Sequence, residues 1–489
     1  MLSRRLRRAA GFCGALVILA GTPVAALAVK PSGDDPLRLA FGQPTTVTQG
    51  KPFQAAEPSI RVDATDPNQR IWITAPAGIL PGSRSLPESS ESGDLVWYSD
   101  DDGKSWTFVT GPGGVTGPTV IGGGDSDVVT GFGSEVYLTG LTLANITLAA
   151  SCANGEKGTW TTNPVSNIGA VEDRQWIDGW EDNPKPLLGP DLVLNYGGVA
   201  ERRMWFHQVV APACAPPVAG PRIDVSGPEC VEAILDPDCY QWPGNMAIDE
   251  ATGDVYVTHN TFGDEGAPHN DDVIVARVDG GASGPVTQAN VHSFVAANDR
   301  PDTFDSFTSL AVDRQSNLYL VWSERHPESQ TTDTMLATSS DRGETWTEPI
   351  TVNHAPNTTT FPWIVAGDAG KIDIVYYGTN EKGPSPETVP ESSRWRVWMA
   401  QSLNALDATP TFREVPATGF MHQGSICTSG TGCAPGTRDL LDFFQVDVDA
   451  QGLANISYTD NLNTPPDGTD PHQEWIMFVQ QKGGRGLCD

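Results

Sequence analysis

One phrase recurs along this chain and constrains its fold more than any other feature. It consists of an apolar strand that ends near an aspartate, a short polar turn and a second apolar strand. Seven copies can be followed, and they begin at Ile60, Val128, Trp176, Ala247, Leu310, Trp363 and Val446. The copies begin roughly 50–80 residues apart, and repeated antiparallel units at this spacing are typical of β-propellers. We therefore predict an all-β chain that forms one propeller of seven four-stranded antiparallel blades.

Two other arrangements stay open, six blades and an array of β-sandwiches. Six blades are the alternative because the second and third units are the least regular. We expect residues 29–489 to form a single domain. Only one strand-like run, residues 474–479, follows the last copy of the phrase. The N-terminal run at residues 37–41 is therefore expected to add the missing strand and to close the ring, which leaves no open edge.

A second motif, S-x-D-x-G-x-[ST]-W, occurs at Ser99–Trp106 and again at Ser339–Trp346. Ser and Asp side chains bond nearby backbone N–H groups, Gly supplies a positive φ, and the Trp returns to an apolar layer. The motif predicts a tight turn between strands three and four of a blade. Its structural residues are Ser99, Asp101, Gly103 and Trp106 in the first copy and Ser339, Asp341, Gly343 and Trp346 in the second.

These turns resemble the Asp-box, or BNR repeat, of the sialidase-like (neuraminidase superfamily) propellers. Ser151–Trp160 resembles a degenerate third copy. The boxes cover only these short turns, and the repeated phrase extends the resemblance over residues 36–482. Because unrelated activities share Asp-boxes, the resemblance indicates the fold rather than a reaction.

The N-terminus has the three parts of a secretory signal peptide. Four arginines at positions 4, 5, 7 and 8 precede an apolar run at 11–20 and then Ala26-Leu27-Ala28. We expect cleavage near Ala28 and a secreted, extracellular protein. The apolar run is shorter than the roughly 20 residues of a spanning helix, which disfavours a membrane anchor. The export route stays open, because Arg7 stands where a twin-arginine signal has an apolar residue.

The charge of the chain limits its partners. The formal net charge is −31, and removal of residues 1–28 takes away four arginines and no acid, which gives −35. Nucleic acids and anionic membranes attract basic surfaces. We therefore expect no nucleic-acid partner and no membrane insertion, and we expect a glycan or a cell-envelope ligand. The oligomeric state stays open.

Cysteine usage agrees with export. Of the eight cysteines, Cys13 leaves with the signal peptide, and the other seven are expected to form disulfides in an oxidising compartment. Pairs Cys230–Cys239 and Cys427–Cys433 would each close a short loop, and Cys152–Cys214 is a longer-range pairing. Cys488 is expected to be unpaired. No C-x₂-C pair occurs, so we predict no metal site at the cysteines.

The order of the strands within a blade indicates on which face of the propeller the binding site is expected. In a four-stranded meander, connections from strand two to three and from strand four to the next blade lie opposite the Asp-box turns. The long connections there are Ala75–Gly93, His259–Asp272, Ser323–Asp333, Thr379–Arg394 and Thr459–Gln473. Long loops on one face of a rigid scaffold usually carry binding. We call this the loop-bearing face and the other the turn-bearing face.

Residues that enter each first strand should ring the central mouth of the loop-bearing face. The ligand-binding residues we predict there are Asp173, Arg174, Trp176, Trp363 and Phe443. Aromatic rings stack on sugar faces, while acids and arginines bond hydroxyls or a substrate carboxylate.

The resemblance also implies what a sialidase would need: an arginine cluster, an Asp acid/base and a Tyr nucleophile helped by Glu. The F/Y-R-I/L-P motif of the first arginine is absent, and the nearest place is residues 58–63, around Arg61. Candidate catalytic residues, none fixed by a motif, are Asp173, Arg174, Glu324, Arg325, Tyr377 and Asp442. The chain has no G-x-S-x-G, H-E-x-x-H or Walker motif.

No cofactor is predicted. Asp100–Asp102 and Asn270–Asp272 could attract calcium, yet neither has EF-hand spacing. Three functions stay open: a secreted propeller that binds a carbohydrate or cell-envelope ligand, an exo-acting glycoside hydrolase of sialidase type, and a non-catalytic protein-interaction propeller.

Overall fold

The computed structural model describes most of the chain after residue 37. The described residues are 38–48, 55–63, 66, 68–77, 93–110, 124–131, 135–142, 145–156, 158–164, 172–180, 192–198, 201–211, 215–226, 239–263, 271–281, 284–294, 303, 306–430, 433–434, 437–463 and 474–488. The predicted signal peptide and its cleavage site lie outside these ranges. So do Cys214, Cys230 and Asn270.

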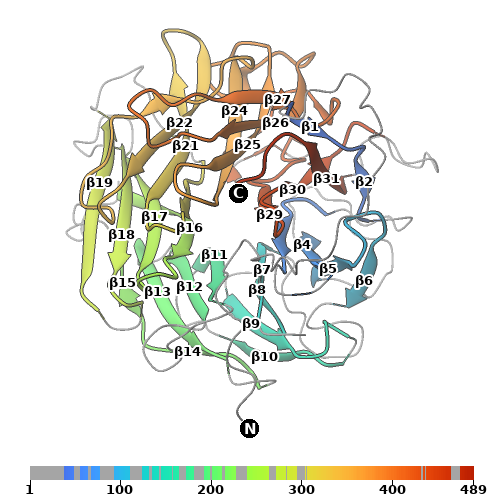
Figure 1. Ribbon diagram of the computed structural model, residues 1–489, viewed down its shortest axis with the longest axis vertical. Coiled ribbons are helices and arrows are strands. Elements are labelled where there is room, and N and C mark those ends of the chain that lie inside the picture. Colours follow the sequence, from blue (N-terminus) through green and yellow to red (C-terminus); the bar gives the residue numbers. More distant parts are fainter. Residues whose placement is uncertain are drawn as a thin grey trace, which may run out of the picture.

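The regular secondary structure of the described chain is almost entirely strand, arranged in sheets around a common centre, which confirms the prediction of an all-β propeller with four-stranded antiparallel blades (Figure 1). The first blade holds β3 (Ser59–Val62), β4 (Ile71–Ala77), β5 (Gly93–Ser99) and β6 (Thr107–Thr110). The second holds β7 (Ser126–Thr130), β8 (Val136–Thr142), β9 (Asn145–Ser151) and β10 (Thr161–Pro164). The third holds β11 (Glu172–Gly179), β12 (Leu192–Gly198), β13 (Arg203–Val210), β14 (Val218–Ala219) and β15 (Ile223–Asp224).

The remaining strands complete the ring. The fourth blade holds β16 (Cys239–Ile248), β17 (Val255–Gly263), β18 (Asp271–Val278) and β19 (Val286–Phe294). A nine-stranded sheet follows, with β20 (Ser309–Val312), β21 (Leu318–His326), β22 (Thr331–Ser339), β23 (Ile350–Thr351), β24 (Thr358–Ala366), β25 (Ile372–Thr379), β26 (Arg394–Ser402), β27 (Arg413–Pro416) and β28 (His422–Gln423). The last blade joins β29 (Gln445–Val448), β30 (Ala454–Asp460) and β31 (Trp475–Gly483) to β1 (Ala40–Phe41) and β2 (Thr45–Thr46).

The prediction of seven separate blades, with six as its alternative, is wrong in its count. Hydrogen bonding makes five separate blades, while β20–β28 share one sheet. Within that sheet, two antiparallel meanders meet at a single parallel residue pair, Thr332 with Thr358. The physical reason is the shortness of β23, which covers only Met335 and Leu336 of β22 and leaves Thr332 free to pair with β24.

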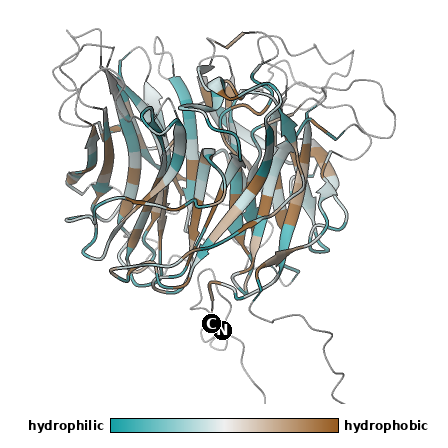
Figure 2. Ribbon diagram, turned by 90° about the horizontal axis from the view of Figure 1, so that it is seen from above, coloured by the Kyte–Doolittle hydropathy of each residue, from teal (hydrophilic) through white to brown (hydrophobic). Residues whose placement is uncertain are grey.

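The core lies in layers between neighbouring sheets. Successive side chains of a strand point to opposite faces, and in β4 both faces are buried. Ile71 and Ile73 pack with Phe478 of the last blade, whereas Trp72 packs with Val128 of the second. Figure 2 shows hydrophobic residues along the middle of the strands. Each blade is therefore held by the blade on either side of it.

Polar side chains join five pairs of neighbouring innermost strands around the axis. Val62 N–H donates to Asp447 Oδ2 (2.7 Å), Ile177 N–H to Asp127 Oδ2 (3.1 Å), and Ile248 N–H to Asp178 Oδ2 (3.2 Å). In the same way, Leu310 N–H donates to Asn245 Oδ1 (2.6 Å), and Ile364 N–H to Ser309 Oγ (3.3 Å). An innermost strand has no strand partner on its inner edge, and buried N–H groups need acceptors. We call these five acceptors the axial acceptors.

The two S-x-D-x-G-x-[ST]-W turns have the same hydrogen bonds. In the second, Ser339 Oγ donates to Asp341 Oδ1 (2.8 Å), Gly343 N–H donates to Ser339 Oγ (3.0 Å), and Thr345 N–H donates to Asp341 Oδ1 (2.9 Å). The bonds from Thr345 lower the pKa of Asp341. The first turn repeats this set around Asp101, with Gly103 at φ +74°. The aspartate therefore holds the turn.

Two further turns vary this pattern. In Ser151–Trp160, Ala153 replaces the aspartate, and Ser151 Oγ contacts Thr159 Oγ1 directly (2.7 Å), while Gly155 N–H still donates to Ser151 Oγ (3.0 Å). In the β26–β27 turn, whose sequence departs from the motif, Asn404 Oδ1 accepts from Ser402 Oγ (3.3 Å) and from Thr411 N–H (3.0 Å). The sequence hides this copy because the turn is longer and an amide replaces the carboxylate.

The Cys427–Cys433 disulfide is confirmed. Cys152 is also disulfide-bonded, and so is Cys488, which corrects the expectation that Cys488 is unpaired. Pairings Cys152–Cys214 and Cys230–Cys239 each involve a residue outside the described ranges. In the described part of the chain, we find no helix with the length and apolar character needed to cross a bilayer.

The axial acceptors can be tested at Asn245, whose Oδ1 accepts from Leu310 N–H and whose Nδ2 donates to Leu310 O (3.1 Å). We expect Asn245→Ala to lower the free energy of unfolding by about 3 kcal/mol, because it leaves two buried backbone groups without partners. Urea denaturation measures this. Asn290→Ala, at an exposed site on β19, is the control and should cost no more than about 0.5 kcal/mol. Equal costs would contradict the role of Asn245.

The first turn docks on the last blade. A Cβ at Gly103 would lie 2.1 Å from the Phe478 ring. We expect Gly103→Ala to destabilise the fold by about 2–4 kcal/mol, from steric overlap added to backbone strain. Gly158→Ala has a similar φ of +82° but no atom within 4 Å, so it reports the strain alone, about 1 kcal/mol. Thermal unfolding of both variants separates docking from strain, and equal shifts in Tm would argue against docking.

Candidate active site at the central mouth

Left-handed residues recur where the innermost strands begin. Glu57, Arg174, Phe361 and Leu441 have φ values of +60°, +44°, +54° and +56°. Each lies at or just before an innermost strand, and β11 and β24 have register shifts there. A residue in this left-handed conformation lowers the folding stability by about 1 kcal/mol, and such residues cluster at functional sites. The pattern marks the mouth of the loop-bearing face as the candidate site.

Arg174 lies at the centre of this mouth and is 1% exposed. Its guanidinium carbon is 3.5 Å from the ring centroid of Trp176 and 4.0 Å from that of Phe443. Arg174 Nη1 lies 3.6 Å from Asp125 Oδ1. Among the described residues, none of its three guanidinium nitrogens has a hydrogen-bond partner. The stacked rings and the charge of Asp125 are what hold this buried cation.

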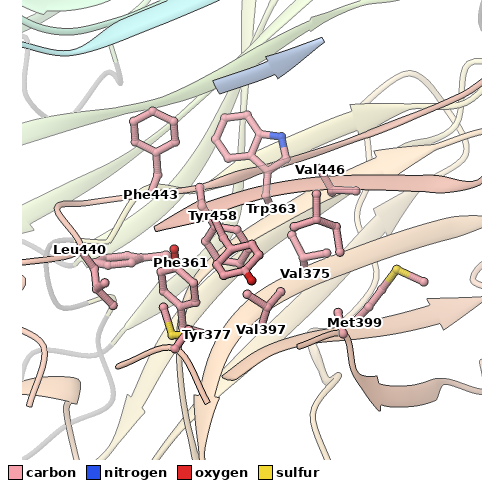
Figure 3. Packing of buried hydrophobic residues seen from close by; sticks show 14 of the residues in the cluster. Phe361, Trp363, Val375, Tyr377, Val397, Met399, Leu440, Phe443, Val446 and Tyr458 are labelled. Atoms are coloured by element: carbon pink, nitrogen blue, oxygen red, sulfur yellow. The ribbon is translucent and has the colours of Figure 1, made fainter. Parts of the chain in front are cut away.

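The predicted aromatic residues close the channel beneath the mouth. Trp176 contacts Trp363 (4.9 Å between ring centroids), Phe443 (5.0 Å) and Phe307 (5.7 Å). All four rings are buried. Figure 3 shows Trp363 and Phe443 in the same cluster as Phe361 and Tyr377. Trp176, Trp363 and Phe443 therefore form an aromatic plug that supports the mouth from below.

Four carboxyl groups surround Arg174: those of Glu57, Asp125, Asp173 and Asp442. Burial, the charge of Asp125 and that of Asp442 raise the pKa of Asp173 to about 7. Burial and the charge of Asp125 also hold the pKa of Glu57 well above its usual range. Burial raises the pKa of Asp442. A shared field thus favours the protonated form of these three groups.

Arg438 supplies the second cation of the mouth. It donates to Asp442 from Nε (3.3 Å) and from Nη2, and the Asp442 N–H donates to Glu57 Oε1 (3.2 Å). The segment that carries both residues is anchored before it reaches the mouth, because Cys427 N–H donates to Thr437 O (3.2 Å) and Cys427 is bonded to Cys433. Asp125, Arg438 and Asp442 are 16%, 20% and 13% exposed, so ligands can reach them.

The structure thus brings together Asp173, Arg174, Asp442, Trp176, Trp363 and Phe443, all predicted for the mouth. Glu324 and Arg325 lie on the β21–β22 hairpin instead, where Glu324 Oε2 accepts from Trp322 Nε1 (3.1 Å). That hairpin replaces the loop expected at Ser323–Asp333, since only residues 327–330 separate its strands. Tyr377 is buried against Phe444 (4.0 Å between centroids), and its hydroxyl accepts from Thr459 N–H (3.1 Å).

Sequence reasoning missed Asp125, although a signal for it exists. Asp125 immediately precedes β7 and Asp173 lies at the start of β11, so both occupy the entrance of an innermost strand. The second unit was too irregular for that alignment to be applied. Arg61, the nearest match to a sialidase arginine, points to the axis and lies 3.8 Å from Asp178, one of the axial acceptors.

The described residues offer one close group of metal-ligating types, Glu387 with Cys427 and Cys433. These two sulfurs are bonded to each other, and Glu387 Oε1 accepts from the N–H groups of Thr428 (2.7 Å) and Ser429 (3.1 Å). The group therefore anchors a loop. At Asp100–Asp102, Asp101 is occupied by the turn hydrogen bonds.

No protein-family model matches the chain, and no curated protein matches it. Among solved structures, a phage phi92 endosialidase is similar with a TM-score of 0.46 and 12% identity, over 91% of this chain and 69% of that one. An α-L-arabinofuranosidase from Fusarium graminearum is similar with a TM-score of 0.44 and 12% identity, over 90% of this chain and 98% of that one. A protein of unknown function from Dyadobacter fermentans is similar with a TM-score of 0.43 and 13% identity, over 91% of this chain and 99% of that one. At this distance, function has to rest on the residues of this chain.

The raised pKa of Asp173 predicts how stability depends on pH. The Asp173 carboxyl is protonated in both states below about pH 4, and the folded state loses stability as the pH rises towards 7, where the buried group ionises. Between pH 4 and pH 8, we expect the free energy of unfolding of Asp173→Asn to rise by about 1–3 kcal/mol relative to that of the wild type. Urea denaturation at a series of pH values measures this. Asp102→Asn, at an exposed turn, is the control, and parallel curves for wild type and Asp173→Asn would contradict the prediction.

Proposed function

We propose that this protein is a secreted propeller that binds a carbohydrate at the mouth of its loop-bearing face. The observation that carries the proposal is the gathering of partly exposed Asp125, Asp173, Asp442 and Arg438 around one point, above a closed channel. Carboxylates accept hydrogen bonds from sugar hydroxyls, and a guanidinium donates to sugar oxygens. A ligand rich in both donors and acceptors suits this mixed set.

The charge balance of the mouth narrows the ligand class. Four carboxyl groups stand against Arg174 and Arg438, and the whole chain carries a net charge of −31. Phosphates carry the larger negative charge and are disfavoured in this acidic chain, whereas neutral sugars meet no such repulsion. The rings of the aromatic plug lie below these polar groups. Recognition in this proposal therefore uses hydrogen bonds from the charged residues rather than stacking on the plug.

Glycoside hydrolysis is the second candidate, and the pKa of Asp173 favours it. A carboxyl group with a pKa of about 7 is protonated in a useful fraction at neutral pH and can act as a general acid. Asp125 or Asp442 would then be the second carboxylate. Tyr377 is less suited to the nucleophile role of a sialidase, because it is buried and its hydroxyl accepts the Thr459 N–H.

A glycan array and a panel of fluorogenic glycosides, applied to the mature protein, test both candidates. We expect Asp173→Ala and Arg438→Gln each to weaken glycan binding about tenfold, because each removes a hydrogen-bonding group from the mouth. If a glycoside is hydrolysed, we expect Asp173→Asn to lower kcat/KM about 100-fold. The wild-type rate should then fall as the pH rises above about 7, where the acid loses its proton.

Asp102→Asn, with an exposed carboxylate on the turn-bearing face, is the matched control and should leave both activities unchanged. Unchanged binding by Asp173→Ala and Arg438→Gln would reject the mouth as the glycan site. Hydrolysis by Asp173→Asn at the wild-type rate would reject the general acid. If the wild type neither binds a glycan on the array nor hydrolyses a glycoside, a protein-interaction propeller would be favoured.

A further inference from the structure

Two arginines stack on an exposed phenylalanine outside the mouth. Phe420 is 36% exposed, and the guanidinium carbons of Arg396 and Arg394 lie 4.0 Å and 5.5 Å from its ring centroid. Arg394 and Arg396 flank the buried Trp395 at the start of β26, so they leave the same face of that strand. We call Arg394, Arg396 and Phe420 the arginine platform.

The backbone under the platform is fixed on both sides. Ala417 N–H donates to Val397 O (2.8 Å), and Met421 N–H donates to Trp395 O (2.9 Å). Ala417 and Met421 are buried, while Phe420 between them is exposed. These bonds set the direction in which the Phe420 side chain leaves the chain. The ring is therefore a fixed surface on which both guanidiniums rest.

The two guanidiniums have no anionic partner in the part of the chain that the structure describes. Other arginines of this acidic protein pair with carboxylates, as Arg70 does with Asp100 (2.6 Å) and Arg314 with Asp368 (2.8 Å). Arg394 is exposed and Arg396 half-buried. A guanidinium that stacks through its face keeps its N–H edges free to donate. Two such cations side by side repel each other unless an anion lies between them.

We propose that the arginine platform binds the carboxylate of a uronic acid residue in an acidic polysaccharide. A carboxylate accepts two parallel hydrogen bonds from a guanidinium edge, and a second arginine adds charge and a further donor. The apolar edge of the Phe420 ring lies beside the bound group and can contact the sugar ring. A net charge of −31 repels any polyanion at longer range, and repels a sulfated polymer of higher charge density more than a polyuronate, so binding depends on this local pair of cations.

The platform is independent of the proposed function of the mouth, because it shares no residue with the mouth. Binding of polygalacturonate to the mature protein, measured by calorimetry, tests it. We expect Arg394→Gln/Arg396→Gln and Phe420→Ala each to weaken binding about tenfold or more. Arg396→Lys keeps the charge but loses the planar face, and should also weaken binding. Arg314→Gln, which removes an arginine paired with Asp368, is the matched control and should bind as wild type does.

Two further ligands identify the chemistry. Methyl-esterified polygalacturonate lacks the free carboxylate and should not bind, and dextran sulfate should bind more weakly than polygalacturonate. Absence of wild-type binding to polygalacturonate would overturn the proposal. So would equal binding of the ester, preference for dextran sulfate, or wild-type affinity in the double variant. Thermal unfolding of each variant confirms that it is folded.

Discussion

The hydrogen bonds from five innermost strands to the axial acceptors on their neighbours are the interaction on which this architecture depends. They satisfy buried N–H groups that no strand can reach, and they fix how closely the innermost strands approach one another. They also force polar groups onto the axis, among them Asp127, Asp178 and Asp447. Burial raises the pKa of Asp178 to about 6, and the nearby Arg61 opposes that shift. The charge of Arg61 therefore serves the buried carboxyl groups of the axis.

The mouth is built on the same strands. β7 begins next to Asp125 and carries the axial acceptor Asp127, and β11 carries both Asp173 and the axial acceptor Asp178. Because the acceptors fix these strands, the carboxyl groups at their entrances are held close together and share a field that raises the pKa of Asp173. The axial acceptors thus hold the two strands whose entrances bring these carboxyl groups together.

The sequence predicted those parts that depend on local pattern. Strand alternation and turn chemistry are local, so the propeller, the two S-x-D-x-G-x-[ST]-W turns and the Cys427–Cys433 bridge could be inferred. The number of separate sheets depends instead on one residue pair, Thr332 with Thr358. The direction of the mouth residues was also beyond reach, because a bulge inserts one residue and reverses the alternation that follows it. The bulge at Arg174 is why Trp176, expected to face a sugar, packs inside the plug.

The two faces of the molecule carry different constraints on their residues. On the turn-bearing face, the S-x-D-x-G-x-[ST]-W turns dock on a neighbouring blade, as Gly103 does against Phe478, so their residues are committed to the fold. On the loop-bearing face, the mouth groups are held from below and stay partly exposed above. In a chain this acidic, long-range attraction contributes little to capture of an anionic ligand. Affinity has to come from short-range hydrogen bonds, which reward the fixed geometry that the axial acceptors provide.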